Sequence, residues 1–202
     1  ELRDKHVGAI TDLLNGDVPR GLPLLGFPEI SMEGMTPWGG CGANPRPQAI
    51  EKRWRTFGRH LAGGFPYSEG IYEDVNKAIY AGLYGAPGRP VDDVLRDYVA
   101  AELSPAVVEE GVEMLKLMET TLPRSGLSAT RLDGAPRIEA LADAIEKRLH
   151  PEIASGWRWR VLRIRARIAA LLQRHEGRVT PELETELAQL HTLYHADETS
   201  LL

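Results

Sequence analysis

Apolar residues recur along most of the chain at the spacing of an amphipathic helix. Segment 48–61 is a clear case, and its apolar residues are Ile50, Trp54, Phe57 and Leu61. Intervals of four, three and four residues place them on one helical face. The same pattern predicts further helices over residues 2–14, 71–84, 90 onward, 104–121, 136–149, 156–174 and 180–197.

One segment departs from this helical spacing. Residues 22–32, with the sequence LPLLGFPEISM, form a continuous apolar run of strand length that contains two prolines. Such a run predicts a buried strand, which proline restricts to an edge or a bulge of a sheet. No later segment has a strand pattern, so we expect strands to be absent after about Met32. The predicted fold class is therefore mainly α.

Glycine and proline are unevenly distributed. The chain has 20 glycines and 14 prolines, and 22 of these residues lie in two stretches, 16–47 and 63–90. They predict two loops that flank the helix 48–61, namely Glu33–Pro47 (EGMTPWGGCGANPRP) and Ala62–Gly70 (AGGFPYSEG). In α/β folds, ligands bind at loops that follow the carboxyl ends of strands. A ligand site is therefore expected at these loops.

Composition narrows the classes to which the chain can belong. With 43% hydrophobic and 26% charged residues, it is neither a disordered acidic chain nor a collagen. Its single cysteine, Cys41, excludes an internal disulfide framework and a cysteine zinc cluster. No apolar run approaches the ~20 residues of a membrane span, and a net charge of −5 argues against general electrostatic binding of nucleic acid. We expect no membrane or nucleic-acid partner, no metal and no cofactor.

Five carboxylates border the two loops. They are Glu29, Glu33, Glu69, Glu73 and Asp74. Two carboxylates with separated pKa values can divide the duties of acid and base in glycoside hydrolysis. Other interpretations stay open: Glu73 and Asp74 suit the first turn of the following helix, where the dipole favours acids. Glu29, inside an apolar run, requires either a functional role or a salt bridge.

Four aromatic residues form a second candidate group in and beside the loops. They are Trp38, Phe65, Tyr67 and Tyr72. Aromatic rings stack on the flat C–H faces of sugars, while carboxylates and amides such as Asn44 and Asn76 hydrogen-bond the hydroxyl groups. The alternative is that these rings anchor long loops to the body of the domain, since aromatic side chains contribute much of the buried area of proteins.

The helix predicted over 156–174 contains a run of arginines. Its apolar residues, among them Trp157 and Ile168, fall on one stripe, so the arginines occupy the flanks and the opposite face. A solvated face, or ion pairs with the acidic segments Glu109–Glu113 or Glu182–Glu186, is a better interpretation than a nucleic-acid contact.

Two other features carry no predicted chemistry. His191 and His195 stand one helical turn apart, but the glutamate of an H-E-x-x-H zinc motif is absent and no third ligand is indicated. Cys41 has no identifiable histidine or asparagine partner in the sequence, so we interpret it as a non-catalytic thiol.

Two stretches of the chain resemble a known family. They are ISMEGMTPWGGCGANPRP, at 30–47, and GGFPYSEGIYEDVNKAIYAGLYGAPGRPVDDVLRDYVAAELSP, at 63–105. Over about Leu22–Pro105 the chain is similar to the C-terminal part of bacterial glycosidase-like proteins with a TIM-barrel catalytic domain, of the β-N-acetylhexosaminidase and α-glucuronidase types. In that family the last barrel strand is followed by a loop, a last barrel helix and a helical post-barrel domain.

The resemblance implies two domains and a carbohydrate ligand. Residues 1–62 would form the last helix–strand–loop–helix unit of a (β/α) barrel, and residues 63–202 a helical post-barrel domain. The implied sugar-binding residues are Trp38, Glu29, Glu33, Tyr67, Glu69 and Tyr72. No residue matches a catalytic motif of the family. The paired catalytic carboxylates usually belong to a middle barrel strand, so an upstream catalytic domain or a second chain would supply them.

The leading hypothesis is that the chain is the C-terminal segment of a glycoside hydrolase, which contributes a sugar-subsite loop and a helical support domain. Such a chain is a glycosidase only as part of a longer protein. The alternative is a stand-alone helical module that binds a protein partner without catalysis. A third interpretation makes the arginine helix a contact for nucleic acid.

Overall fold

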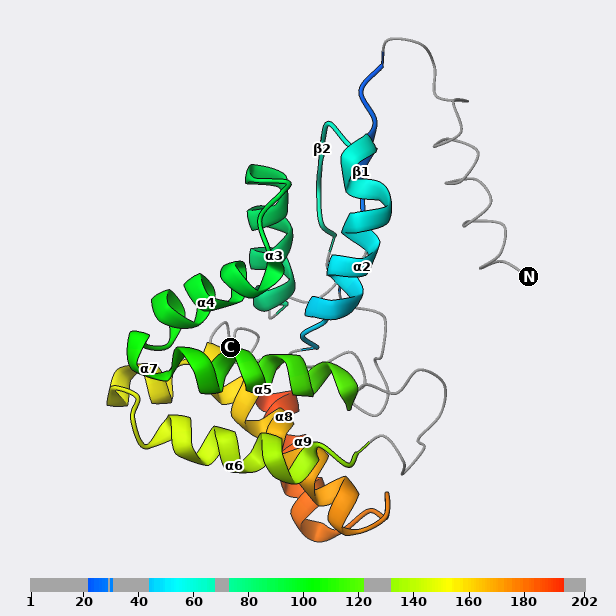
Figure 1. Cartoon of the computed structure of the whole chain (residues 1–202). Coiled ribbons are helices and arrows are strands. Elements are labelled where there is room, and N and C mark those ends of the chain that lie inside the picture. Colours follow the sequence, from blue (N-terminus) through cyan, green and yellow to red (C-terminus); the bar gives the residue numbers. More distant parts are fainter. Residues whose placement is uncertain (1–21, 29, 31–43, 68–72, 122–131, 195–202) are drawn as a thin grey trace, which may run out of the picture.

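The computed structural model describes residues 22–28, 30, 44–67, 73–121 and 132–194. Helices make up most of this part of the chain, which confirms the mainly α fold class (Figure 1). The α-helices are α2 (Pro47–Phe57), α3 (Asp74–Gly85), α4 (Val91–Glu102), α5 (Val108–Thr120), α6 (Ala135–Glu146), α7 (Pro151–Ser155), α8 (Trp157–Arg174) and α9 (Pro181–Tyr194). The other elements are two 3-10 turns, η2 (Gly58–His60) and η3 (Pro105–Val107), and two short strands, β1 (Leu25–Gly26) and β2 (Gly63–Gly64).

The predicted helices within the described residues agree with the observed ones except near their ends. Ser104 caps η3, because its hydroxyl accepts a hydrogen bond of 3.1 Å from the N–H two residues on. Thr180 caps α9, because its hydroxyl accepts a hydrogen bond of 3.3 Å from the N–H three residues on. The helix predicted over 2–14 lies outside the described residues. Helix α7 is not predicted, because Pro151 indicates a stop. It is instead the first residue of that helix, where proline has no hydrogen bond to lose.

The strand predicted within 22–32 is present, and it has a partner that the sequence pattern does not indicate. β1 and β2 run parallel, with Leu25 opposite Gly63 and Gly26 opposite Gly64. Backbone hydrogen bonds of 2.8–2.9 Å extend the pairing from Leu24 through Pro28, and at Ile30, along residues 62–67. The expectation that no strand follows Met32 is therefore wrong, as is the assignment of residues 62–67 to a loop.

Close packing against α3 explains one glycine in each of the two strands. Gly26 and Gly64 both face the hydroxyl of Tyr84: a Cβ on Gly26 would lie 2.7 Å from that oxygen, and one on Gly64 would lie closer still. A glycine-rich segment is typical of a loop. Here the missing side chains instead let the strands approach the helix.

β1, α2, β2 and α3 form one βαβα unit. α2 connects the two parallel strands, which cannot be joined by a tight turn. It packs against α3, where the rings of Trp54 and Tyr84 meet edge to face with their centroids 5.1 Å apart. The predicted domain boundary, between residues 62 and 63, coincides with the start of β2, and the division into two domains stays a prediction.

Helices α4 to α9 form a helical bundle, drawn from green to red in Figure 1. α8 is its central helix, because it packs against α6, α7 and α9 and is buried on most of its surface. Trp159 of α8 is fully buried, and its indole N–H donates to Glu146 at 3.3 Å. The apolar core runs on without a break into α3 and reaches Ile30 at the end of the first strand segment.

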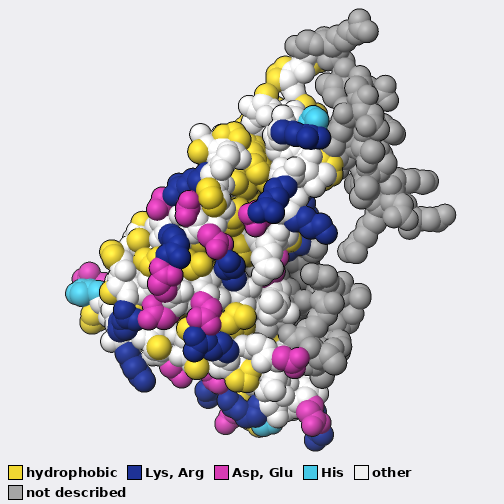
Figure 2. Space-filling model, viewed as in Figure 1, with side chains coloured by type: hydrophobic (Ala, Val, Ile, Leu, Met, Phe, Trp, Pro, Cys, Tyr) yellow, Lys and Arg dark blue, Asp and Glu magenta, His cyan; other side chains and the backbone are white. Residues whose placement is uncertain are grey.

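The arginines of α8 are mostly ion-paired, as predicted for this helix. Arg163 contacts Asp143 at 2.6 Å and Glu146 at 3.1 Å, and Arg167 contacts Glu139 at 2.9 Å. These three carboxylates all lie on α6. Figure 2 shows the outcome on one face of the molecule, where charged side chains of both signs are mixed over the bundle.

Of the two alternatives for the acidic partners one is confirmed, and the predicted placement of the arginines is wrong for one residue. Of the two acidic segments named as partners, Glu182–Glu186 contributes Glu186, 3.7 Å from Arg167, whereas Glu109–Glu113 pairs with arginines outside α8. Arg165 is not on a flank of the helix but buried in the core. Helix α8 is covered on several sides, so the position of a residue relative to a single stripe does not decide its exposure.

Candidate functional site

Of the six residues predicted to bind sugar, the structure describes one. Tyr67 ends the segment that pairs with the first strand: its N–H donates to Pro28 O at 2.8 Å, and its carbonyl accepts from Ile30 N–H at 2.9 Å. It therefore lies at the carboxyl end of the parallel pair. The other five, which lie outside the described residues and whose roles stay predictions, are Glu29, Glu33, Trp38, Glu69 and Tyr72.

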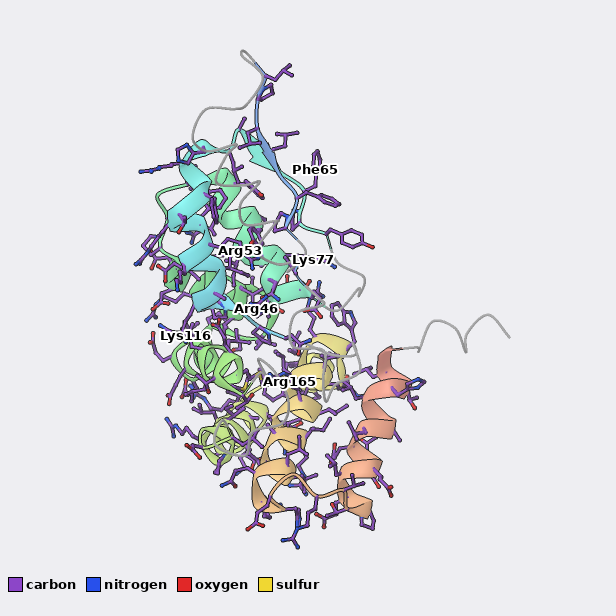
Figure 3. The ribbon with its side chains drawn as sticks, turned by 90° about the vertical axis from the view of Figure 1, so that its right-hand side faces the viewer. Arg46, Arg53, Phe65, Lys77, Lys116 and Arg165 are labelled. Atoms are coloured by element: carbon purple, nitrogen blue, oxygen red, sulfur yellow. The ribbon has the colours of Figure 1, made fainter. Side chains whose placement is uncertain are left out.

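The strand face that points away from α3 carries four large apolar side chains. Alternate residues of a strand point to opposite faces, and Gly26 and Gly64 face Tyr84 of α3. The exposed fractions on the other face are 50% for Leu25, 69% for Phe27, 64% for Phe65 and 40% for Tyr67. We call these four residues the apolar sheet face. Figure 3 shows Phe65 projecting from the side of the strands opposite α2.

Two rings of the apolar sheet face are in contact. The centroids of Phe27 and Tyr67 lie 5.5 Å apart, with the ring planes inclined by 34°, which is within the favourable range for aromatic pairs. Tyr67 is nearer the end at which α/β folds bind ligands. A ring as exposed as that of Phe65 does not anchor its segment to the core of the described chain.

Asn76, on α3, joins the end of the first strand to the start of α2. Its amide nitrogen donates to Ile30 O at 3.2 Å and to Asn44 O at 2.8 Å, and its amide oxygen accepts from Arg46 N–H at 2.9 Å. The residue is 1% exposed. Asn76 therefore positions the backbone at the carboxyl end of the strands, and it is not free to bind a sugar hydroxyl.

Asn44 is as buried as Asn76, but its side-chain amide forms no hydrogen bonds. It is also 1% exposed, but neither its amide nitrogen nor its amide oxygen has a hydrogen-bond partner. Leaving a buried polar group unpaired costs about 1–3 kcal/mol, so nearly all such groups are paired. Among the described residues near the strand ends, Asn44 is therefore a buried amide with unmet hydrogen bonds.

Two buried charges of opposite sign connect this region to the bundle. Glu73 precedes α3, Arg165 lies on α8, and both are almost fully buried. Burial lowers the pKa of Arg165 to about 9, and the negative charge of Glu73 opposes this shift. Arg165 also donates to the Met118 carbonyl at 3.0 Å and to the Thr121 hydroxyl at 3.3 Å. The buried charges of Glu73 and Arg165 thus partly compensate one another inside the protein.

Asp74 is the first residue of α3, as its helix-end interpretation requires. Its carboxylate accepts hydrogen bonds from the Tyr98 hydroxyl at 3.0 Å and from Arg158 Nε at 2.6 Å. Burial and the nearby Asp74 charge raise the pKa of Tyr98, so its phenol stays protonated and remains a donor. Neither Glu73 nor Asp74 is therefore placed as a free acid or base.

No family model, curated protein or solved structure matches this chain. In the part that the structure describes, no group of three or more histidine, cysteine, aspartate or glutamate side chains could hold a metal ion. Nor does any helix in those ranges have the length and apolar character to cross a membrane. The geometry of the apolar sheet face and of Asn44 therefore carries the functional argument.

The sequence pattern misses two parts of this site. Leu25 and Phe27 belong to an apolar run that is typical of a buried strand, yet both side chains are exposed. The alternation of Phe65 and Tyr67 around a proline is typical of a strand. The glycines that precede it are typical of a loop, so the local pattern does not predict the second strand. The unpaired state of Asn44 has no sequence signal, because it depends on neighbours distant in the chain.

Proposed function

We propose that this chain is the C-terminal part of a glycoside hydrolase, in which the βαβα unit completes a (β/α) barrel and the apolar sheet face contributes to a sugar subsite. The observation that carries the proposal is a parallel sheet of two strands with one exposed apolar face. Two parallel strands joined by a helix are packed against α3 on one face and expose large apolar side chains on the other.

A barrel accounts for both faces of this sheet. Parallel sheets are almost always covered on both sides, and parallel strands alternating with helices are the repeating unit of the (β/α) barrel. In a barrel one face of each strand meets the outer helices, as the glycines meet Tyr84 here. The other face points into the packed interior, which is the environment that suits Phe27 and Phe65.

The position of Tyr67 supports the sugar subsite. Active sites of barrel enzymes lie at the carboxyl ends of the strands, and Tyr67 is the last described residue of its strand segment. An aromatic ring there can stack on a sugar ring, and the unpaired amide of Asn44 can hydrogen-bond hydroxyl groups. The resemblance of residues 22–105 to barrel glycosidases favours the same function.

The experiment is a screen of the full-length protein against a panel of nitrophenyl glycosides, followed by saccharide binding to two variants. Tyr67→Ala is expected to weaken binding about tenfold, which is ~1.4 kcal/mol and within reach of one lost aromatic contact. Tyr67→Phe keeps the ring and is expected to retain most of the affinity.

Val179→Ala is the matched control, because Val179 is also largely exposed and follows α8, away from the strands. It is expected to leave saccharide binding unchanged. Hydrolysis of no glycoside by the full-length protein, together with equal saccharide binding by wild type and Tyr67→Ala, would overturn the proposal. That result would favour the helical module that binds a protein partner.

A further inference from the structure

A cleft between α7, α8 and α9 lies apart from the βαβα unit. Its volume is about 700 Å³, which falls within the ~300–1,000 Å³ of typical small-molecule sites. Ala154 and Ile164 give it an apolar part, and Glu146 and Glu186 are among its polar lining residues. None of these residues belongs to the proposed sugar subsite.

Three arginines of α8 line the cleft. They are Arg160, Arg163 and Arg167. Because they are three and four residues apart, they lie on one side of the helix. Guanidinium groups bind carboxylate and phosphate oxygens through paired N–H donors. The cleft thus has the donors of an oxyanion site.

Carboxylates of α6 hold Arg163 in place and leave part of it unused. Its Nη2 donates to Asp143 at 2.6 Å and its Nε to Glu146 at 3.1 Å. Its Nη1 is shielded from solvent and has no hydrogen-bond partner. An unmet buried donor is costly, so a ligand oxygen that reaches it after a small side-chain movement is bound favourably.

Arg160 differs from its two neighbours in the cleft. Its side chain is exposed, and its guanidinium forms no ion pair or hydrogen bond with another described residue. Arg160 is therefore able to move onto a bound ligand without breaking an existing contact.

The glutamates of the cleft restrict the kind of ligand that fits. Burial raises the pKa of Glu186, while the charges of Arg167 and Arg163 oppose that rise, which places this carboxyl in a partly shielded position beside the arginines. A bare anion would meet the carboxylates of Glu146 and Glu186 as well as the arginines. A ligand that also carries hydroxyl groups would instead donate hydrogen bonds to those carboxylates.

From these contacts we infer that the cleft binds a small polyhydroxy acid, whose phosphate or carboxylate group is held by Arg160 and Arg163 and whose hydroxyl groups donate to Glu146 and Glu186. This site is independent of the proposed sugar subsite, and either can fail without the other.

Calorimetric titration of the full-length protein with five probes tests the inference. Glycerol phosphate and glycerate each combine an oxyanion with hydroxyl groups, inorganic phosphate and acetate carry the oxyanion alone, and glycerol carries the hydroxyl groups alone. At least one combined probe is expected to bind about tenfold more tightly than its simple anion, at matched ionic strength. The preference between glycerol phosphate and glycerate then identifies the acidic group.

Variants assign the binding to the cleft. Arg160→Gln is expected to weaken the combined probe about tenfold without lowering the melting temperature, since the side chain has no partner to lose. Glu186→Gln is expected to weaken the combined probe but not inorganic phosphate. The matched control is Arg178→Gln, because Arg178 is an exposed arginine that does not line the cleft.

Three results would overturn the inference. The first is the absence of binding by all five probes. The second is equal affinity in wild type and Arg160→Gln. The third is binding of inorganic phosphate with no gain from added hydroxyl groups, which would indicate an adventitious ion only.

Discussion

The strands of the βαβα unit and the helices of the bundle differ in how completely their apolar side chains are buried. In the bundle, helices surround α8 until residues such as Trp159 and Ile168 have no exposed surface. In the βαβα unit, α3 covers one side of the strands while Phe27 and Phe65 on the other side stay more than half exposed. Figure 2 shows hydrophobic side chains gathered over the βαβα unit, at the top of the view, and charged side chains of both signs over the bundle below it.

This difference separates the apolar residues that the helices of this chain bury from those of the strands that stay exposed. A helix buries its apolar stripe against neighbours that follow closely in the sequence, as α5, α6 and α8 do here. A pair of parallel strands needs further strands at its edges and a cover on each face. The bundle therefore buries its apolar residues among its own helices and α3, whereas the strands leave one apolar face exposed.

Truncation of one large ring in each region tests the comparison most strongly. Trp159→Ala is expected to lower the free energy of unfolding by about 3–5 kcal/mol, because it leaves a cavity in the bundle core. Phe27→Ala is expected to change it by less than about 0.5 kcal/mol, because the ring is already exposed. Urea unfolding of both variants measures the difference. Equal losses would show that the apolar sheet face is part of the core.

The link between the two regions is tested at the buried charges. Arg165→Met is expected to cost about 3 kcal/mol, because it leaves the charge of Glu73 buried without its compensating cation. Adding Glu73→Gln is expected to restore most of that stability. Arg178→Met, at an exposed arginine, is the control and is expected to have little effect. A double variant no more stable than Arg165→Met would show that the two charges are not coupled.

Two equally buried asparagines allow a smaller and more specific test. Asn76→Ala is expected to lower the free energy of unfolding by about 1–3 kcal/mol, since it leaves backbone groups of Ile30, Asn44 and Arg46 unpaired. Asn44→Ala removes an amide that has no partner and is expected to be neutral or stabilising. Thermal unfolding compares them. A larger loss for Asn44→Ala would contradict the assigned hydrogen bonds.

The smallest expected effect is the response of the bundle surface to acid. Hydrogen bonds from Arg96 and Arg137 lower the pKa of Glu109 and Glu113 below the ordinary 4.5. A carboxyl with a lowered pKa in the folded state stabilises the protein above its unfolded pKa, and this stabilisation is lost as the pH falls through the folded value. The urea midpoint should therefore fall slightly below about pH 4.5. The double variant E109Q/E113Q should reduce that fall, and an identical profile would contradict it.

Local sequence signals account for the helices better than for the strands. Periodic apolar residues and stops such as Gly85 and Pro90 predict α3 and α4 to within a few residues. The second strand is missed because its Gly64 is required by Tyr84, a residue about twenty positions further along the chain. A contact of this kind between distant residues leaves no local pattern.

The candidate site is predictable to a smaller extent. Aromatic residues beside a glycine-rich loop predict the group that includes Phe65 and Tyr67, and both side chains are exposed. The same reasoning assigns Asn44 and Asn76 equal roles, although one is fully hydrogen-bonded and the other is unpaired. The difference depends on which backbone groups α3 brings beside each amide, and residue type alone does not contain that information.

The central claim of the proposed barrel is that Phe27 and Phe65 of the apolar sheet face are covered by further strands in the full-length protein. Thiol labelling of Phe65→Cys, read at the peptide that contains residue 65, tests it directly in a Cys41→Ser background, which removes the single cysteine of residues 1–202. The rate of labelling is compared between residues 1–202 alone and the full-length protein. The account predicts rapid labelling of the shorter chain and strong protection in the full-length protein. Equally rapid labelling of both would contradict the claim.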